Sequence, residues 1–388
     1  MNTSATTPPG SGLRSPEASP RLPDYAGACV ANIVPSLLGP RGTSGLPAYF
    51  PDVARGARQV VLLVVDGLGW HQLQRRLAAD RNIAPTLATM QGGAITTIAP
   101  TTTVTALTSI TTGATPGEHG LVGYRIDFAG HVVQMLKWAD SRGDARKRLA
   151  PRDVQPCPPF LGGSMPVLSK ADFDGTAFTE SHLRDQRMLS WRAVSSMVVD
   201  VRTMLQAGEK FVYCYYDCVD KIAHERGFGD YYDSELRTTD RLIADLASVL
   251  PRDAVLLVTA DHGQVMVGDN TRPLHPDITR LVTHQSGEGR FRWLHSKGGC
   301  IEDIVSAVRL HHGDDAWVMT RDEMIDGGYF GPRVTDVVRR RLGDVAVMAR
   351  TDVSFDDPAD KTYFALQCRH GSLTSEEIDV PLLAVAGR

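Results

Sequence analysis

Three apolar runs, each followed within a few residues by an aspartate, place the strongest constraint on how this chain can fold. The runs are residues 58–65, 210–216 and 254–259, and the aspartates that follow them are Asp66, Asp220 and Asp261. A continuous apolar run of this length is typical of a β-strand that is buried on both faces of a sheet. We therefore predict that the three aspartates lie at the carboxyl ends of buried strands, where α/β sheets bind their ligands.

Segments with helical patterns separate these strands along the chain. The sequence predicts helices at about 32–38, 70–79, 103–112, 192–207, 234–250, 302–311 and 334–342, and further strands at 94–99 and 344–350. Strands that alternate with helices form a mostly parallel sheet with helices on both of its faces. The predicted fold class is α/β, with a mostly parallel central sheet and an inserted smaller subdomain.

The ends of the chain and two irregular stretches define its organisation. Residues 1–22 are rich in Ser, Thr, Pro and Gly, so we predict a disordered N-terminal tail. Residues 23–388 are predicted to form one catalytic domain, with excursions from the sheet at about 125–190 and 265–350. The first excursion is rich in proline, and the second is rich in Gly, Arg and His.

Composition excludes several classes of protein. The 388 residues are 42% hydrophobic and 22% charged, with a formal net charge of −4. These values are typical of a globular protein without a basic surface for a nucleic-acid polymer. No stretch approaches the roughly 18 apolar residues of a membrane-spanning helix, and the first residues lack the apolar core of a secretory signal. We therefore expect a cytoplasmic protein without a membrane span. Six cysteines in so long a chain do not indicate a disulfide scaffold.

Seven side chains that can bind metal lie mostly at or near the predicted strand ends. They are Asp66, Thr103, Asp220, His224, Asp261, His262 and His370. Asp220 and His224 are four residues apart, which places them on one face of a helix. Carboxylates, imidazoles and one hydroxyl suit two closely spaced divalent ions, zinc or alternatively manganese. Such a pair can hold the attacking and leaving oxygens of a phosphoryl group in line, so the set predicts a phosphoryl-transfer enzyme.

The other histidines divide into three groups. His119 lies in a turn after the threonine-rich helix, and we predict that it fixes this turn. His275, His284 and His295 lie in the second excursion and could line the pocket, which the sequence leaves open. The remaining ones are expected on the surface or in the core: His71, His131, His182, His311 and His312.

The order of these motifs resembles the alkaline phosphatase superfamily, and most closely its type I phosphodiesterase/nucleotide pyrophosphatase branch. The matching positions are Asp66–Gly67, Pro100, Thr101, Thr103, Gly113, Pro116, His119–Gly120, Asp220, His224, Asp261–His262–Gly263 and His370–Gly371. The resemblance implies an alkaline-phosphatase-like fold and a nucleophile at Thr103 that forms a phosphothreonine. It also implies that one zinc is held by Asp220, His224 and His370. The other zinc would be held by Asp66, Asp261, His262 and the Thr103 oxygen.

The chain departs from that branch next to the implied nucleophile. Where the branch has an asparagine twenty-one residues after the nucleophile, this chain has Tyr124. We expect Tyr124 to bind substrate, because a tyrosine hydroxyl can also donate a hydrogen bond to a phosphate oxygen, although with a different reach. The Phe-Pro-Asn that follows the nucleophile in the branch is replaced by Val104, Thr105 and Ala106. These departures leave the substrate within the branch open.

Several functions are compatible with this set of residues. We predict a hydrolase of phosphodiester or pyrophosphate bonds that acts on a small phosphate ester or nucleotide. A phosphomonoesterase or a phosphomutase of the same superfamily is the alternative. A sulfatase would need a cysteine or serine at the position of Thr103. A non-catalytic binding protein would be expected to have lost some of the metal ligands, whereas all of them are present here. The leaving group and the oligomeric state do not follow from the sequence.

Overall fold

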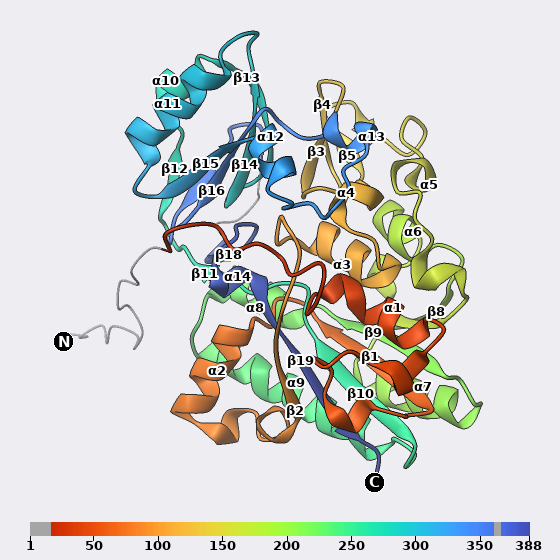
Figure 1. Cartoon of the computed structure of the whole chain (residues 1–388). Coiled ribbons are helices and arrows are strands. Elements are labelled where there is room, and N and C mark those ends of the chain that lie inside the picture. Colours follow the sequence, from red (N-terminus) through yellow and green to blue (C-terminus); the bar gives the residue numbers. More distant parts are fainter. Residues whose placement is uncertain (1–16, 361–365) are drawn as a thin grey trace, which may run out of the picture.

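A mixed sheet built from the predicted apolar strands forms the centre of the computed structural model, which describes residues 17–360 and 366–388 (Figure 1). Within these residues the sheet has seven strands in the spatial order β2-β19-β10-β1-β9-β7-β8. The strands are β1 (Gln59–Val65), β2 (Gln91–Thr96), β7 (Pro166–Lys170), β8 (Arg187–Trp191), β9 (Phe211–Tyr216), β10 (Ala254–Thr259) and β19 (Asp379–Ala386). β19 runs antiparallel to β10 and β2, and the other described pairs are parallel. The predicted α/β class with a mostly parallel sheet is confirmed.

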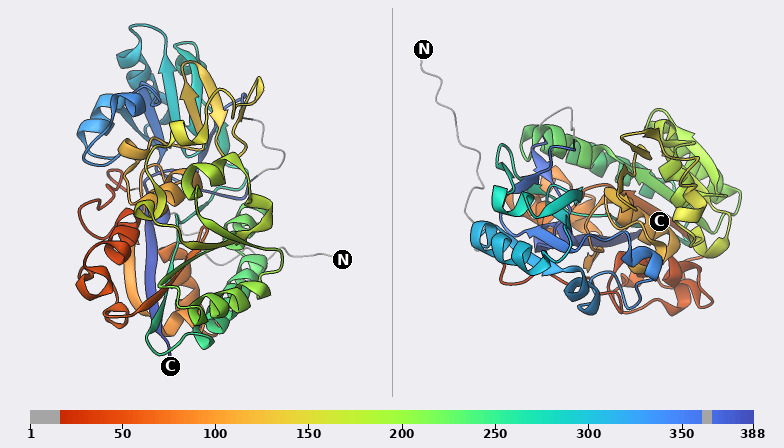
Figure 2. Two further views of the ribbon diagram at one scale, coloured as in Figure 1. Left: turned by 90° about the vertical axis from the view of Figure 1, so that its right-hand side faces the viewer. Right: turned by 90° about the horizontal axis from the view of Figure 1, so that it is seen from above.

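Helices cover both faces of this sheet (Figure 2). They include α1 (Ile33–Leu38), α2 (Trp70–Ala79), α3 (Thr103–Thr112), α6 (Ala177–Leu183), α7 (Ser195–Gln206) and α9 (Asp230–Ser248). The chain passes from β8 through α7 to β9, and then from β9 through α9 to β10. Both connections advance towards the same side of the sheet. Right-handed crossovers therefore place α7 and α9 on one face, and α3 and α6 contact each other on the other. Because both faces are covered, every residue of β9 and β10 is buried.

A second lobe lies above the carboxyl ends of the central strands (Figure 1). Its antiparallel sheet has the order β13-β14-β16-β15 and is covered by α11 (Ile301–His312). The strands are β13 (Val282–Glu288), β14 (Phe291–Ser296), β15 (Ala316–Thr320) and β16 (Val345–Ala349). Buried side chains such as Leu294, Ile304 and Val347 give this lobe a hydrophobic core of its own. The lobe corresponds to the excursion predicted at 265–350.

The excursion predicted at 125–190 departs from the central sheet only in its first part. A small antiparallel sheet begins it, with β3 (Arg125–Phe128), β4 (His131–Gln134), β5 (Ala139–Asp140) and β6 (Gly143–Asp144). β3 contacts β13 of the upper lobe. The chain then returns to the central sheet as β7 and β8, two strands that were not themselves predicted from the sequence.

The remaining α-helices and strands complete the fold and correct two predicted boundaries. They are α4 (Pro116–His119), α5 (Pro151–Val154), α8 (Cys218–Arg226), α10 (Pro276–Thr279), α12 (Arg321–Asp326), α13 (Asp336–Arg339), α14 (Ser375–Ile378), β11 (Val265–Met266), β12 (Thr271–Pro273), β17 (Ser354–Asp356) and β18 (Cys368–Arg369). The helix predicted at 334–342 is only the four residues of α13. The strand predicted at 94–99 is three residues too late, because β2 ends at Thr96.

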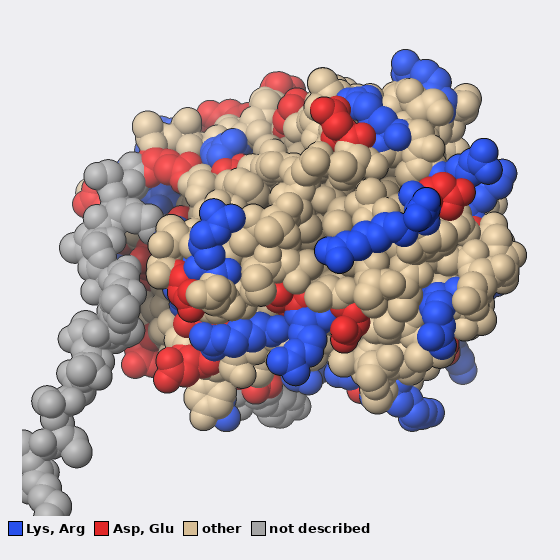
Figure 3. All heavy atoms as spheres, turned by 90° about the horizontal axis from the view of Figure 1, so that it is seen from below, with Lys and Arg blue, Asp and Glu red and all other residues tan. Residues whose placement is uncertain are grey.

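One face of the protein shows how its charged side chains are distributed. The face seen from below carries basic and acidic side chains interspersed (Figure 3). Among the described residues, no helix combines the length and apolarity needed to cross a bilayer.

Residues 1–16 of the predicted tail lie outside the described part of the chain. Residues 17–22 contact the body of the protein, where Arg21 pairs with Asp379 and Glu17 accepts a hydrogen bond from the Ser375 amide.

Candidate metal centre and active site

The order of the strands brings the three predicted aspartates together. β10, β1 and β9 are adjacent and parallel, so their carboxyl ends meet at one edge of the sheet. Asp66 follows β1, Asp261 follows β10, and Asp220 lies in the first turn of α8 after β9. The Asp220 amide donates to the Asp66 carbonyl oxygen at 3.0 Å. The Gly67 amide donates to Asp261 Oδ1 at 3.1 Å, which joins the third segment to the other two.

Thr103 and His370 reach the same place from the segments next to β2 and β19, the two strands at one side of the sheet. Thr103 is the first residue of α3, and His370 lies in the loop between β18 and α14. These two loops are joined because the Thr101 amide donates to the Gly371 carbonyl oxygen at 3.2 Å. His370 Nδ1 also donates to the Thr101 carbonyl oxygen at 2.8 Å. The nucleophile segment and the late His-Gly segment are therefore held as one unit.

His262 is at the centre of a first cluster of candidate ligands. Its Nε2 lies 3.3 Å from Asp66 Oδ1, 3.5 Å from Asp261 Oδ2 and 3.2 Å from Thr103 Oγ1. Two ligand atoms about 2.0–2.1 Å from a tetrahedral zinc ion lie about 3.3–3.4 Å apart. The spacing of these atoms therefore fits a single divalent ion.

Asp220 is at the centre of a second cluster beside the first. Its Oδ1 lies 3.2 Å from His224 Nε2 and 3.8 Å from His370 Nε2. The rings of His262 and His370 stack with 3.6 Å between their centroids, so the two clusters are in contact. Ligand atoms of Asp220, His262 and His370 all lie within 4.8 Å of one another. The structure thus brings together all seven predicted ligands.

Backbone carbonyl oxygens fix the orientation of the three histidines. Nδ1 of His224 lies 2.6 Å from the Cys368 oxygen, and Nδ1 of His262 lies 3.1 Å from the Gly263 oxygen. His370 makes the contact to Thr101 described above. Because a carbonyl oxygen only accepts hydrogen bonds, each Nδ1 must carry a proton, and in the neutral ring each Nε2 presents a lone pair to the clusters. Such outer contacts orient histidines that bind metals in proteins.

Because the carboxylates of the first cluster are buried, their negative charge is energetically unfavourable unless a cation lies beside them. Asp66 is 4% exposed and Asp261 is fully buried. Burial raises the pKa of both carboxyls, and repulsion from Asp261 and Asp220 raises that of Asp66 further. Within the described part of the chain, Asp66 Oδ1 and Asp261 Oδ2 have no hydrogen-bond donor. A divalent cation would satisfy both oxygens, so the residues fit a metal ion.

Two supporting side chains were not predicted from the sequence. The Tyr215 hydroxyl donates to Asp66 Oδ2, and Gln264 Nε2 donates to Asp220 Oδ1 at 2.9 Å. Tyr215 lies within the apolar run of β9, where an aromatic residue looks like part of the core. Only the parallel pairing of β9 with β1, which places Tyr215 beside Val64, shows that its hydroxyl can reach Asp66.

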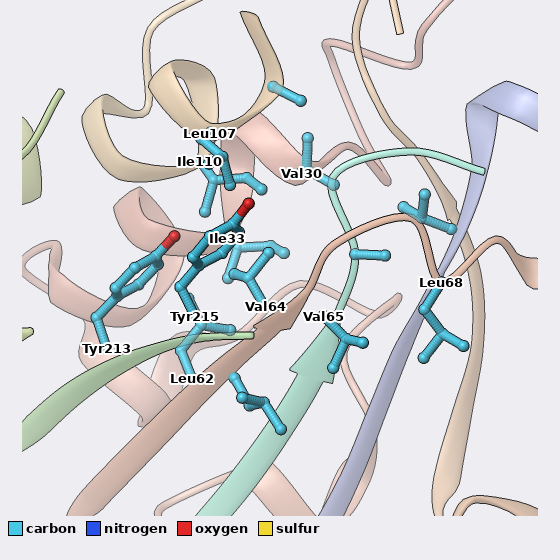
Figure 4. Close-up of a cluster of buried hydrophobic side chains, with 14 of the residues drawn as sticks. Val30, Ile33, Leu62, Val64, Val65, Leu68, Leu107, Ile110, Tyr213 and Tyr215 are labelled. Atoms are coloured by element: carbon cyan, nitrogen blue, oxygen red, sulfur yellow. The ribbon is translucent and has the colours of Figure 1, made fainter. Parts of the chain in front are cut away.

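We expect Tyr215→Phe to weaken metal binding. The variant removes the donor to Asp66 Oδ2, and the loss of such an outer contact costs about 10–100-fold in metal affinity or activity. Tyr213→Phe is the matched control, because both tyrosines lie on β9 and point in the same direction towards α3 (Figure 4). Among the described residues, the Tyr213 hydroxyl has no hydrogen-bond partner. Titration of each protein with zinc measures the difference, and equal affinities would contradict the role of Tyr215.

Two cavities border Thr103. The first, of about 450 Å³, has a largely apolar wall that includes Leu107, Phe173 and Phe178. The second, of about 400 Å³, is lined by Tyr124, Lys137, Glu288, Arg369 and other residues. The two cavities share Thr103, Leu136, Asp220, His224 and Leu366. A phosphoryl group at Thr103 would thus have space on two sides.

The second cavity contains the predicted substrate-binding residue. Burial raises the pKa of Tyr124 to about 12, so its hydroxyl keeps its proton and can donate it to a ligand. Gln134 Nε2 donates to the same hydroxyl oxygen. Arg125, the nearest arginine after Thr103, does not line either cavity among the described residues, and pairs instead with Asp357.

Glu288, which also lines this cavity, makes the free energy of unfolding depend on pH. Burial raises its pKa to about 8, although a hydrogen bond from Thr102 opposes the shift. Between about pH 4.5 and pH 8 the folded protein therefore keeps a proton that the unfolded chain releases, and stability falls as the pH rises. We expect Glu288→Gln to remove this part of the decline, so the variant gains stability over the wild type above pH 8. Denaturant unfolding from pH 5 to pH 9 tests this, and parallel curves would contradict it.

The other described histidines lie outside the two clusters of candidate ligands, although His182 lines the first cavity. His119 is buried, and it fixes its turn as predicted: its Nε2 lies 2.9 Å from Ser109 Oγ, and its Nδ1 accepts from the Leu121 amide. Of the described residues that line the two cavities, none is His275, His284 or His295. The structure therefore resolves the question that the sequence left open.

Comparison with known proteins agrees with this geometry. A family model described as type I phosphodiesterase / nucleotide pyrophosphatase matches residues 60–373. The solved structure of murine ectonucleotide pyrophosphatase/phosphodiesterase 5 is similar, with 14% sequence identity, a TM-score of 0.60, and coverage of 85% of this chain and 88% of that chain. Phosphonoacetate hydrolase from Sinorhizobium meliloti 1021 is similar with 16% identity, a TM-score of 0.62, and coverage of 85% and 90%.

The two kinds of match carry different weight. At these identities the solved structures establish a shared fold alone, and a search of curated proteins finds no match. The family model, in contrast, runs from the first residues of β1 to the loop after His370, and so spans every segment that contributes to the metal centre. This chain belongs to the type I phosphodiesterase/nucleotide pyrophosphatase family.

Proposed function

We propose that the chain is a metal-dependent hydrolase of phosphodiester or pyrophosphate bonds that acts through a phosphothreonine on Thr103. The position of the Thr103 hydroxyl carries this proposal. Its Oγ1 lies 3.2 Å from His262 Nε2, inside the cluster of candidate ligands, and the residue borders both cavities.

The seven ligands would hold two divalent ions. Asp66, Asp261, His262 and Thr103 would bind one, and the other would be bound by Asp220, His224 and His370. The mixture of nitrogen and oxygen donors suits zinc, and manganese is the alternative. When bound, the ions would lower the pKa of the attacking hydroxyl and stabilise negative charge on the leaving oxygen.

The chain's own residues would carry out two successive displacements. Thr103 Oγ1 gives up its proton to solvent and attacks phosphorus, while the bond to the leaving oxygen breaks. Water then attacks the phosphothreonine, which returns the threonine hydroxyl and releases the phosphoryl group. The backbone N–H groups in the first turn of α3 have no acceptor within the helix, so they can donate to the phosphoryl oxygens.

The two cavities support a substrate with a group on each side of phosphorus. A diester or a pyrophosphate has two such groups, whereas a monoester would fill only one cavity. The apolar first cavity, with Phe173 and Phe178, suits a flat nucleoside base. In the second cavity, Tyr124 would donate to a non-bridging phosphate oxygen. An inactive variant of murine ectonucleotide pyrophosphatase/phosphodiesterase 5 was solved in complex with AMP, which supports a nucleotide here.

Relative rates on a small panel of substrates test this assignment. The zinc-loaded protein is assayed with bis-p-nitrophenyl phosphate, p-nitrophenyl phosphate, a dinucleotide and phosphonoacetate. We expect the diester or the dinucleotide to be cleaved faster than the monoester. A faster monoester would favour a phosphomonoesterase, and retention of the phosphoryl group on an organic product would favour a phosphomutase. Cleavage of phosphonoacetate alone would reassign the enzyme to phosphonate hydrolysis, the activity named for the similar bacterial protein.

A further inference from the structure

We propose that Arg369 determines specificity by binding a second anionic group of the substrate, next to the phosphoryl group that Thr103 attacks. This role rests on the proposed function, because it names the group that the second cavity would hold during that reaction. Arg369 is the last residue of β18, and it lines this cavity together with Thr103 and Tyr124. The preferred substrates would be pyrophosphates, or phosphoryl compounds with a neighbouring carboxylate, and not diesters whose leaving group carries no further charge.

The guanidinium of Arg369 has no acidic partner. Among the described residues it forms no ion pair or hydrogen bond, and its Nε is buried without an acceptor. The nearby arginines differ in this respect, because a carboxylate pairs with each of Arg125, Arg290 and Arg292. Burial of a charged donor is unfavourable unless an acceptor satisfies it, so an anion bound in the cavity would stabilise this guanidinium.

Gly289 shows that the guanidinium itself lies at the wall of the cavity. This glycine is in the turn between β13 and β14, and it lines the same cavity. A Cβ at this position would lie only 3.2 Å from Arg369 Nη1 and would overlap Ser354 Oγ. A side chain there would therefore displace the arginine or the serine, and glycine lets the turn pass close to the guanidinium.

The charges around the second cavity also suit an anion. Apart from the candidate metal ligands, Arg369 and Lys137 are the basic residues among its described lining residues. Of the acidic ones, Asp220 belongs to the candidate metal centre, and Asp360 forms ion pairs with two arginines that do not line the cavity. The raised pKa of Glu288, about 8, leaves this carboxyl largely protonated at neutral pH.

The shape of a guanidinium explains which substrates it would favour. Its planar fork can bind a phosphate or a carboxylate through two parallel hydrogen bonds. In a pyrophosphate the second phosphate is linked directly to the one under attack, so Tyr124 could donate to the first and Arg369 to the second. Phosphonoacetate, which was solved in complex with the similar bacterial hydrolase, has a carboxylate close to its phosphoryl group. The chemistry common to both is an anion beside the reacting phosphorus.

Two substrates that transfer the same adenylyl group test this role. Diadenosine pyrophosphate has a second phosphate in its leaving group, and the p-nitrophenyl ester of AMP does not. We expect Arg369→Gln to lower kcat/KM for the pyrophosphate by about 10–100-fold, because a charged hydrogen bond is lost, and to change that for the ester less than about 3-fold. Arg369→Lys should retain part of the preference. The control Arg280→Gln replaces an exposed arginine of the upper lobe and should change neither value.

The comparison separates specificity from a structural effect on the neighbouring His370, which would lower both rates equally. Phosphonoacetate is assayed in parallel, and a loss in Arg369→Gln confined to this compound would assign the site to a carboxylate. Equal losses on all substrates, or no selective loss on either anionic one, would overturn the proposal. If wild type cleaves none of the three compounds, the proposed function fails, and the binding measurement below still tests Arg369.

A crystal structure tests binding without turnover and without an Arg369 variant that has to fold. Thr103→Ala is crystallised with zinc and diadenosine pyrophosphate. We expect an oxygen of the second phosphate to lie about 3 Å from a guanidinium nitrogen of Arg369. A second phosphate that lies elsewhere, or that is not bound at all, would overturn the proposal.

Discussion

Thr103→Ala is expected to lower turnover by roughly 10³-fold or more while leaving metal binding largely intact. The variant removes the only atom that the proposed mechanism uses to attack phosphorus, but it leaves all six carboxylate and imidazole ligands in place. Steady-state rates on the best substrate, together with zinc content, measure both parts. Thr103→Ser keeps a hydroxyl at the same position and should retain part of the activity.

Thr105→Val is the matched control for this experiment. Thr105 lies on the same helix, is buried, and has a hydroxyl without a hydrogen-bond partner among the described residues. Its replacement should leave the rate close to that of wild type. If Thr103→Ala retained wild-type turnover, Thr103 would not be the nucleophile.

Asp66→Asn is expected to have opposite effects on function and on the stability of the metal-free protein. In the proposed function the Asp66 carboxylate is a metal ligand, so the variant should lose one equivalent of metal and most of its activity. In the absence of metal, the same carboxylate is buried against Asp261 and Asp220, which raise its pKa. Neutral asparagine removes this repulsion and can still accept from Tyr215, so we expect a gain of about 1–2 kcal/mol in the free energy of unfolding.

Asp240→Asn is the control for the stability measurement. Asp240 is also buried, but its two oxygens accept hydrogen bonds from the Thr86 and Leu87 amides at 3.2 Å and 2.8 Å. The same change there should destabilise the protein, because the amide group cannot accept both bonds. Urea unfolding in the presence of a chelator compares the two variants. A loss of stability in metal-free Asp66→Asn would contradict the charge repulsion that we infer at the metal centre.

The sequence was sufficient to predict the part of the fold that depends on local patterns. The uninterrupted apolar residues of β1, β9 and β10 predicted buried parallel strands, and the aspartates after them predicted the edge at which the ligands meet. α2 and β10 also begin and end at the predicted residues. Thr103 and His370 were also predicted, and their segments are linked by tertiary contacts that include the pairing of Thr101 with Gly371.

Features that depend on contacts between distant segments were not predicted. β19 is as apolar as its neighbours, so nothing in its composition shows that it runs antiparallel to them. β7 and β8 are partly polar and follow a proline-rich stretch, which concealed their place in the central sheet. Tyr215 and Gln264 support the metal ligands, but this becomes visible only when the strands are paired. The stacked His284 and His295 are eleven residues apart and meet only because β13 and β14 form a hairpin.

The positions of bound metal ions test the central claim most directly. Crystals grown with zinc, measured on both sides of the zinc absorption edge, should show two anomalous peaks at the carboxyl edge of the central sheet. One peak should lie among Asp66, Thr103, Asp261 and His262, and the other among Asp220, His224 and His370. A single peak, or no peak, at these residues in protein that is catalytically active under the same conditions would contradict the two-ion centre.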